Sequence, residues 1–208
     1  KKLNITMKLG KEVTAQEVLA LKPYSILVAT GSNVISIPLE GLDQVQTVQA
    51  HDVLANDMQF ANKKVVVIGG GITGLETALY INRQGTNQVS VVDMLPEWPV
   101  DMLDMRYQNE ELLEVRHCND QGVALFYNNK VVKFADGKLF IESTKDGEVK
   151  ELPADVIVLS VGVKPNDALW QELLASGHPS VWKAGDAIAT GKINKAVLHG
   201  SKFGYSLN

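Results

Sequence analysis

The sequence contains almost no cysteine, no excess of basic residues and no long hydrophobic run. Cys118 is the single cysteine among 208 residues, which excludes an internal disulfide, a thiol pair for redox chemistry and a cysteine-based metal site. A formal net charge of −4 gives no basic surface for a nucleic acid partner. Spanning a bilayer takes about 20 consecutive apolar residues. Because no such run is present, we expect no membrane partner.

The first residues, Lys1-Lys2-Leu3-Asn4, also lack the apolar stretch of a signal peptide, and no methionine starts the chain. With no disulfide possible, this favours a reducing, cytoplasmic location. The absent methionine predicts that the chain is cut from a longer protein.

Strand-like and helical patterns alternate along most of the chain. The runs typical of strands lie at 25–29, 65–68, 88–92, 123–126, 131–134, 139–143, 156–161 and 180–183. The helical patterns lie at 15–21, 72–84, 107–120 and 167–174, with a fifth beginning near residue 195. This order predicts an α/β fold with a parallel sheet. Asp-Gly turns at Asp136-Gly137 and Asp146-Gly147 predict an antiparallel β-meander over 130–150. The stretch 32–64 is interpreted as a linker or crossover.

The strongest motif is a glycine-rich turn between a strand and a helix. The apolar run Lys64–Ile68 leads directly into Gly69-Gly70-Gly71-Ile72-Thr73-Gly74. In a dinucleotide-binding turn the first glycine allows the sharp bend, the second lets a pyrophosphate approach the backbone, and the third allows close packing of helix on strand. The pyrophosphate then lies on the free N–H groups of the helix.

Asp93 follows the next strand, about 20 residues beyond the last glycine, where a carboxylate accepts from ribose hydroxyls. Its charge would repel the 2′-phosphate of NADP(H). Met94 and the next residues bring no Arg or Lys before Arg106. The motif therefore predicts a Rossmann-like site that prefers NAD(H). The alternative is an ordinary turn with a solvated aspartate.

Three strand ends surround this motif: Ala29-Thr30-Gly31, Val161-Gly162 and Gly185-Asp186. Taken singly, each is an ordinary strand terminus. In this order around the glycine turn, they resemble the pyridine nucleotide-disulfide oxidoreductase fold over nearly the whole chain. The resemblance is closest to the C-terminal portion of the 2,4-dienoyl-CoA reductase and 2-enoate reductase group of NADH:flavin oxidoreductases.

The resemblance implies roles for several residues. Thr30 and Gly31 would lie near FAD, Gly185 would allow close backbone approach, and Asp186 would accept from a ribityl hydroxyl. Gly162 would belong to the coenzyme site. Glu76 matches a family glutamate near the nicotinamide, although a first-turn acid favoured by the helix dipole explains it equally well.

The same resemblance implies the domain organisation. An FAD-domain remnant and linker would occupy 1–50, the NAD(H)-binding domain 51–163, and a return segment of the FAD domain 164–208. The family's FAD-binding glycine turn would lie upstream, together with the flavin and substrate domains expected as partners. We therefore expect FAD in the full-length protein, and weak or absent FAD binding by this chain.

The leading hypothesis is the NADH-binding part of an enzyme that transfers hydride from NADH to FAD, inactive as an isolated fragment. The alternative is a non-catalytic NAD(H) sensor or regulatory module. A Rossmann dehydrogenase acting directly on a small substrate is a weaker third hypothesis. No motif nominates a catalytic residue or a metal ligand, including the four histidines, His51, His117, His178 and His199. Cys118 is interpreted as an inert structural thiol.

Overall fold

The computed structural model describes residues 5–96 and 114–207. The chain folds into two compact units. The central unit is Ile35–Gly162, and the flanking unit combines Lys1–Val34 with Val163–Asn208. Residues 35–50, which the sequence analysis grouped with the first flanking segment, pack within the central unit because they carry a strand of its sheet.

The central unit is built on a five-stranded sheet in which every neighbouring pair of strands is parallel. In spatial order the strands are β3 (Gln46–Gln49), β10 (Val156–Leu159), β4 (Lys64–Ile68), β5 (Gln88–Val92) and β6 (Ala124–Phe126). The predicted parallel sheet is therefore confirmed.

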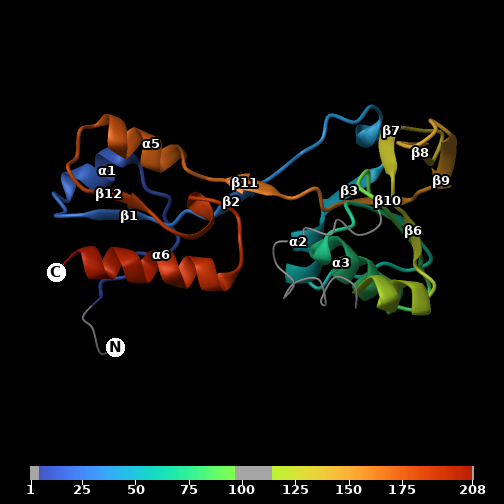
Figure 1. Cartoon of the computed structure of the whole chain (residues 1–208), viewed down its shortest axis with the longest axis horizontal. Helices are drawn as coiled ribbons and strands as arrows, with labels where there is room; N and C mark the ends of the chain where they lie inside the picture. The colour runs from blue at the N-terminus through green and yellow to red at the C-terminus, as the bar shows by residue number, and fades with distance from the viewer. Residues whose placement is uncertain (1–4, 97–113, 208) are drawn as a thin grey trace. The chain divides into compact units, whose positions relative to one another are not determined.

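Side chains of β4 alternate between two separate cores. Val65 and Val67 pack on the side of α2 (Ala50–Ala55) and α3 (Ile72–Asn82), together with residues of the helical stretch 114–120. Val66 and Ile68 pack on the other side against the meander (Figure 1). Burial on both faces explains why this strand is an unbroken apolar run.

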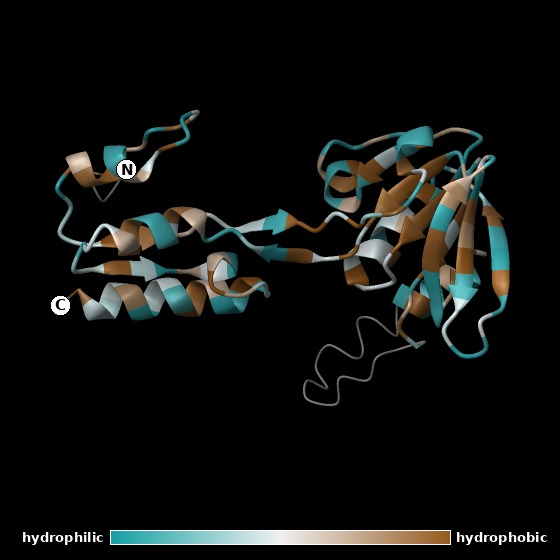
Figure 2. Ribbon diagram, turned by 90° about the horizontal axis from the view of Figure 1, so that it is seen from above, coloured by the Kyte–Doolittle hydropathy of each residue, from teal (hydrophilic) through white to brown (hydrophobic). Residues whose placement is uncertain are grey.

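The meander consists of β7 (Asn129–Ala135), β8 (Lys138–Ser143) and β9 (Val149–Pro153), paired antiparallel as predicted. Asp136 and Gly137 both have positive φ, at 52° and 73°, as a two-residue hairpin turn requires. Leu139 and Ile141 of β8 are fully buried against the sheet. Figure 2 shows apolar strands throughout the inside of this unit.

The flanking unit has a small core around a two-stranded sheet. β1 (Ile26–Val28) pairs in parallel with β12 (Val181–Lys183). α1 (Ala15–Ala20) and α5 (Ala168–Ala175) lie on one face, and α6 (Ile193–Ser206) lies on the other (Figure 1). A short antiparallel ribbon joins β2 (Ser32–Val34) to β11 (Val163–Pro165). The one-turn helix η2 (Gly185–Ala187) follows β12.

The interpretation of 32–64 as a linker or crossover is incomplete: α2 does cross over between β3 and β4, two parallel strands of one sheet, but the stretch also holds further regular elements. This stretch holds β2, η1 (Leu42–Gln44), β3 and α2. Its pattern is weak because β3 is a half-exposed edge strand with polar residues, and α2 is short and has no side-chain N-cap. Of the helix predicted at 107–120, residues 107–113 lie outside the described part of the chain, as does Arg106.

Within residues 5–96 and 114–207, no helix is both long and apolar enough to cross a membrane. The same residues contain no group of three or more His, Cys, Asp or Glu side chains arranged to hold a metal ion.

Candidate functional site

Gly69 makes the bend between β4 and α3. Its φ is +108°, a conformation that side chains other than glycine rarely adopt. Its N–H donates to the Val92 carbonyl at 2.8 Å, and an added Cβ would overlap the Ser160 carbonyl oxygen. The predicted tight turn is confirmed, with the further requirement that this residue pass close to the end of β10.

Gly71 is the N-cap of α3, and it leaves the start of the helix uncovered. It offers no side chain to cap the first N–H groups, and a Cβ placed on it would meet no atom of the described residues within 4 Å. The first N–H bonded within the helix is that of Leu75, which donates to the Gly71 carbonyl at 3.0 Å. The amides of Ile72, Thr73 and Gly74 have no intrahelical partner. An anion can therefore approach the positive end of this helix.

Gly74 and Ala78 bring α3 close to the sheet. A Cβ on Gly74 would overlap the Gly69 carbonyl oxygen and lie 3.3 Å from the Cβ of Ser160. Ala78, one turn further, is fully buried. The close helix–strand packing predicted for the third glycine is confirmed.

Asp93 lies at the end of β5, directly beside the glycine turn. One carboxylate oxygen, Oδ2, accepts from the Gly70 N–H at 2.6 Å, and Oδ1 accepts from the Leu95 N–H at 2.8 Å. No sequence pattern indicates this hydrogen bond between Asp93 and Gly70. The parallel register, which pairs Ile68 with Val92, carries the two segments to the same edge of the sheet. Asp93 thus holds the turn in place, besides presenting a carboxylate.

A pocket of about 510 Å³ lies next to Asp93, within the central unit. Most of its wall is apolar, and its charged members are Asp93 and Lys130. The lining residues are Ile37, Pro38, Leu39, Ile68, Gly69, Val92, Asp93, Met94, Leu95, Asn129, Lys130, Val131, Val132, Ser160 and Val161. Met94 therefore shares a wall with Asp93, and its role in coenzyme binding stays a prediction.

Glu76 lies beyond the first turn of α3, and its side chain is exposed. The first turn of that helix holds no acidic residue. The alternative interpretation of Glu76 as a first-turn acid is therefore wrong, because the helix begins at Ile72 and places Glu76 in the second turn. Its role near a nicotinamide stays a prediction. Gly162, with φ +91°, accepts from the Ile35 N–H at 3.1 Å and is not among the pocket residues.

The flanking unit gathers its predicted residues around a second pocket, of about 470 Å³. Gly31, Gly185 and Asp186 line it. Asp186 Oδ1 accepts from the Gly191 N–H at 3.1 Å, and Oδ2 accepts from Ser32 Oγ at 3.5 Å. The Thr30 hydroxyl instead donates to the Asn166 carbonyl, and Thr30 is not among the lining residues.

His199 supports the same loop from α6. Its Nδ1 accepts from the Gly185 N–H at 3.2 Å, which fixes the proton of a neutral ring on Nε2. No motif in the sequence nominates His199 for a role. Only the folded structure shows that it holds the backbone of Gly185, where φ is +60°.

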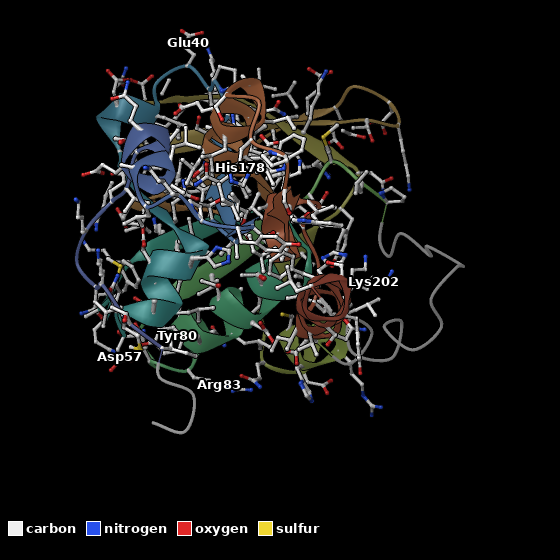
Figure 3. All side chains as sticks on the ribbon, turned by 90° about the vertical axis from the view of Figure 1, so that its left-hand side faces the viewer. Glu40, Asp57, Tyr80, Arg83, His178 and Lys202 are labelled. Atoms are coloured by element: carbon white, nitrogen blue, oxygen red, sulfur yellow. The ribbon has the colours of Figure 1, made fainter. Side chains whose placement is uncertain are left out.

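Two further polar clusters have structural roles. The Tyr80 hydroxyl of α3 donates to Asp57, and the two residues lie side by side in Figure 3. This hydrogen bond raises the pKa of Tyr80 above its usual range. In the flanking unit, His178 Nδ1 accepts from the Ser180 N–H at 3.2 Å, and its Nε2 lies 3.0 Å from the Pro23 carbonyl.

Cys118 is fully buried in the core below α3, with its Sγ 3.9 Å from the Leu75 carbonyl oxygen. Burial raises the pKa of its thiol to about 11, and nearby Glu114 adds to the shift. Since the thiolate is the reactive form, the folded protein should resist thiol reagents at pH 8. We expect slow labelling by Ellman's reagent in buffer and complete labelling in guanidinium chloride. Fast labelling of the folded chain would contradict an inert structural role.

Comparison with known proteins identifies the class. The pyridine nucleotide-disulphide oxidoreductase family model matches residues 4–200, and the chain belongs to this family. The resemblance to the 2-enoate reductase group, inferred from the sequence, is confirmed. The fold is mixed α/β, with parallel and antiparallel strands, and Rossmann-like.

Particular relatives are oxidoreductases. The chain is 32% identical to a bilirubin reductase of Mediterraneibacter gnavus over 80% of its length and 25% of that protein. It is 30% identical to an NADH oxidase of Thermoanaerobacter brockii over 98% of its length and 31% of that protein. A 2-naphthoyl-CoA reductase structure superposes with a TM-score of 0.80 at 26% identity, covering 98% of this chain and 30% of that one. The chain thus spans a quarter to a third of these relatives.

Proposed function

We propose that the central unit binds NADH, and that the chain is the NADH-binding part of a flavin-dependent oxidoreductase in which hydride passes from NADH to FAD. The observation that carries this proposal is the uncapped N-terminus of α3 at Gly71, with the Asp93 carboxylate fixed beside it. A dinucleotide needs both features, because it carries a diphosphate next to a ribose.

The coenzyme would follow the carboxyl edge of the sheet. Its diphosphate would lie on the free amides of Ile72, Thr73 and Gly74, and its adenosine ribose on Asp93. Each Asp93 oxygen accepts one backbone N–H, so each keeps a lone pair for a ribose hydroxyl. The apolar pocket beside Asp93 is of a size typical for small-ligand sites and suits the adenine ring.

The charge of Asp93 supports NADH over NADPH. A 2′-phosphate at about 4 Å from this carboxylate would be repelled by a few kcal/mol at a partly screened site. NADH meets no such repulsion.

The flanking unit suits part of an FAD site. Asp186 would accept from a ribityl hydroxyl, and Gly31 and Gly185 would let the flavin approach the backbone. Bound FAD supplies the hydride acceptor, whereas the protein supplies binding and orientation. We further propose that FAD binds this chain weakly, and that the chain alone turns over no substrate.

The small two-stranded sheet of the flanking unit supports the proposal that further domains of a longer protein pack against this unit. The described residues give β1 and β12 no further strand, although two-stranded sheets are marginal by themselves and parallel sheets are normally buried on both faces. Upstream flavin and substrate domains would supply the missing strands.

Calorimetric titration of the chain with NADH and NADPH tests the proposal. Asp93→Ala should weaken NADH binding by about 10- to 100-fold, the loss expected for hydrogen bonds to a charged group. Asp93→Ala should also reduce the ratio of NADH affinity to NADPH affinity. Asp155→Ala is a matched control, because the Asp155 carboxylate likewise accepts from a backbone N–H, that of Lys64 at 2.8 Å, at the other end of β4. Equal losses in the two variants, or no binding of NADH by the wild type, would refute the proposal.

A further inference from the structure

The wall of the pocket beside Asp93 includes a positively charged residue that no sequence motif indicates. Among the described residues that line the pocket, Lys130 is the only one with a positive charge. It follows Asn129, whose N–H donates to the Asp93 carbonyl at 2.9 Å. The start of β7 is therefore hydrogen-bonded to Asp93, the residue that would bind the ribose.

Lys130 does not stand alone. Its Nζ lies 2.8 Å from Glu142 Oε1, and the two residues face each other directly across the β7–β8 ladder. Their side chains are 50% and 32% exposed, so the ion pair is partly open to solvent and not buried in the core. Glu142 itself is not among the lining residues. Lys133, the next cation along β7, lies over the Phe140 ring at 5.1 Å and is not a lining residue.

We propose that Glu142 is a specificity-determining residue for the coenzyme: by pairing with Lys130, it withholds that ammonium group from a 2′-phosphate. The inference rests on the proposed NADH site. A free lysine in the wall that it shares with Asp93 would offset the repulsion from that carboxylate and admit NADPH. A lysine already neutralised by a carboxylate offers a phosphate little attraction, and Glu142 itself adds negative charge.

The test is the NADPH affinity of Glu142→Gln in the whole chain. Freeing Lys130 should strengthen NADPH binding by about two- to fivefold, the upper part of the range of an exposed ion pair. NADH affinity should change by less than about twofold, because NADH has no phosphate for Lys130 to contact. The gain should shrink at high salt.

Glu151→Gln is the matched control. Glu151 pairs with Lys138 at 2.6 Å on the same meander, its side chain is 48% exposed, and neither residue lines the pocket. The double variant Lys130→Met with Glu142→Gln should lose the gain in NADPH affinity. The inference is overturned if the control gains as much as Glu142→Gln, or if the gain survives without Lys130. Its failure differs from that of the proposed function, which would appear as wild-type protein that does not bind NADH.

Discussion

Replacing Gly71 with alanine should leave the fold intact and weaken NADH binding by between about five- and 150-fold. This range corresponds to the 1–3 kcal/mol that an extra methyl group costs in a close-fitting site. The methyl group meets no atom of residues 5–96 and 114–207 within 4 Å, and φ at this position is −72°, which alanine adopts readily. It does, however, point into the open space where we propose that the diphosphate lies.

The measurement is calorimetric titration with NADH, accompanied by urea unfolding of the same variant. Gly204→Ala in α6 is the control, because that glycine also has open space around it but lies in the flanking unit. The control should bind NADH like the wild type. If Gly71→Ala also binds normally, the diphosphate does not lie on this helix end.

The conformational roles of Gly69 and Gly74 could be predicted from the sequence because they depend on local chain geometry. A strand that turns straight into a helix needs a residue that tolerates positive φ, and a helix that crosses its own strand closely needs a small one. Both requirements act within one βα unit, so the order of residues was sufficient to identify them.

The bond from Gly70 to Asp93 could not be predicted in the same way. It joins residues on different strands, and it depends on the register that pairs Ile68 with Val92. The same holds for Lys130, which lines the pocket beside Asp93 although it belongs to β7, where the N–H of the preceding Asn129 donates to the Asp93 carbonyl. Tertiary neighbours of this kind leave no periodic signal in the chain.

Edge elements were missed for a different reason. β3 is recognised only by its parallel pairing with β10, since Gln46, Thr47 and Gln49 give it no apolar run. An edge strand buries less side-chain surface than a central one, and its composition is therefore less constrained. In contrast, β4 is central and covered on both faces, and its sequence identifies it unambiguously.

Gly74→Ala should lower the stability of the fold, whereas Gly71→Ala should lower only NADH affinity, although the two positions lie in one turn. Here the added Cβ overlaps the Gly69 carbonyl oxygen and lies 3.1 Å from the carbonyl carbon, and both are backbone atoms that cannot rotate away. Helix and strand must separate. We expect the free energy of unfolding to fall by about 3 kcal/mol, the upper part of the usual range for overpacking.

The labelling rate of Cys118 measures this loss of stability within the central unit, because the thiol is buried beneath α3 near Leu75. Opening of the helix exposes the thiol, so Gly74→Ala should label much faster with Ellman's reagent than the wild type, while Gly71→Ala should not. One variant would thus lose stability and the other only NADH affinity. If both lose stability equally, the space at Gly71 is needed for folding and not for the diphosphate. If Gly74→Ala is as stable as the wild type, α3 does not pack against Gly69 as described, and the helix end is not held where a dinucleotide requires it.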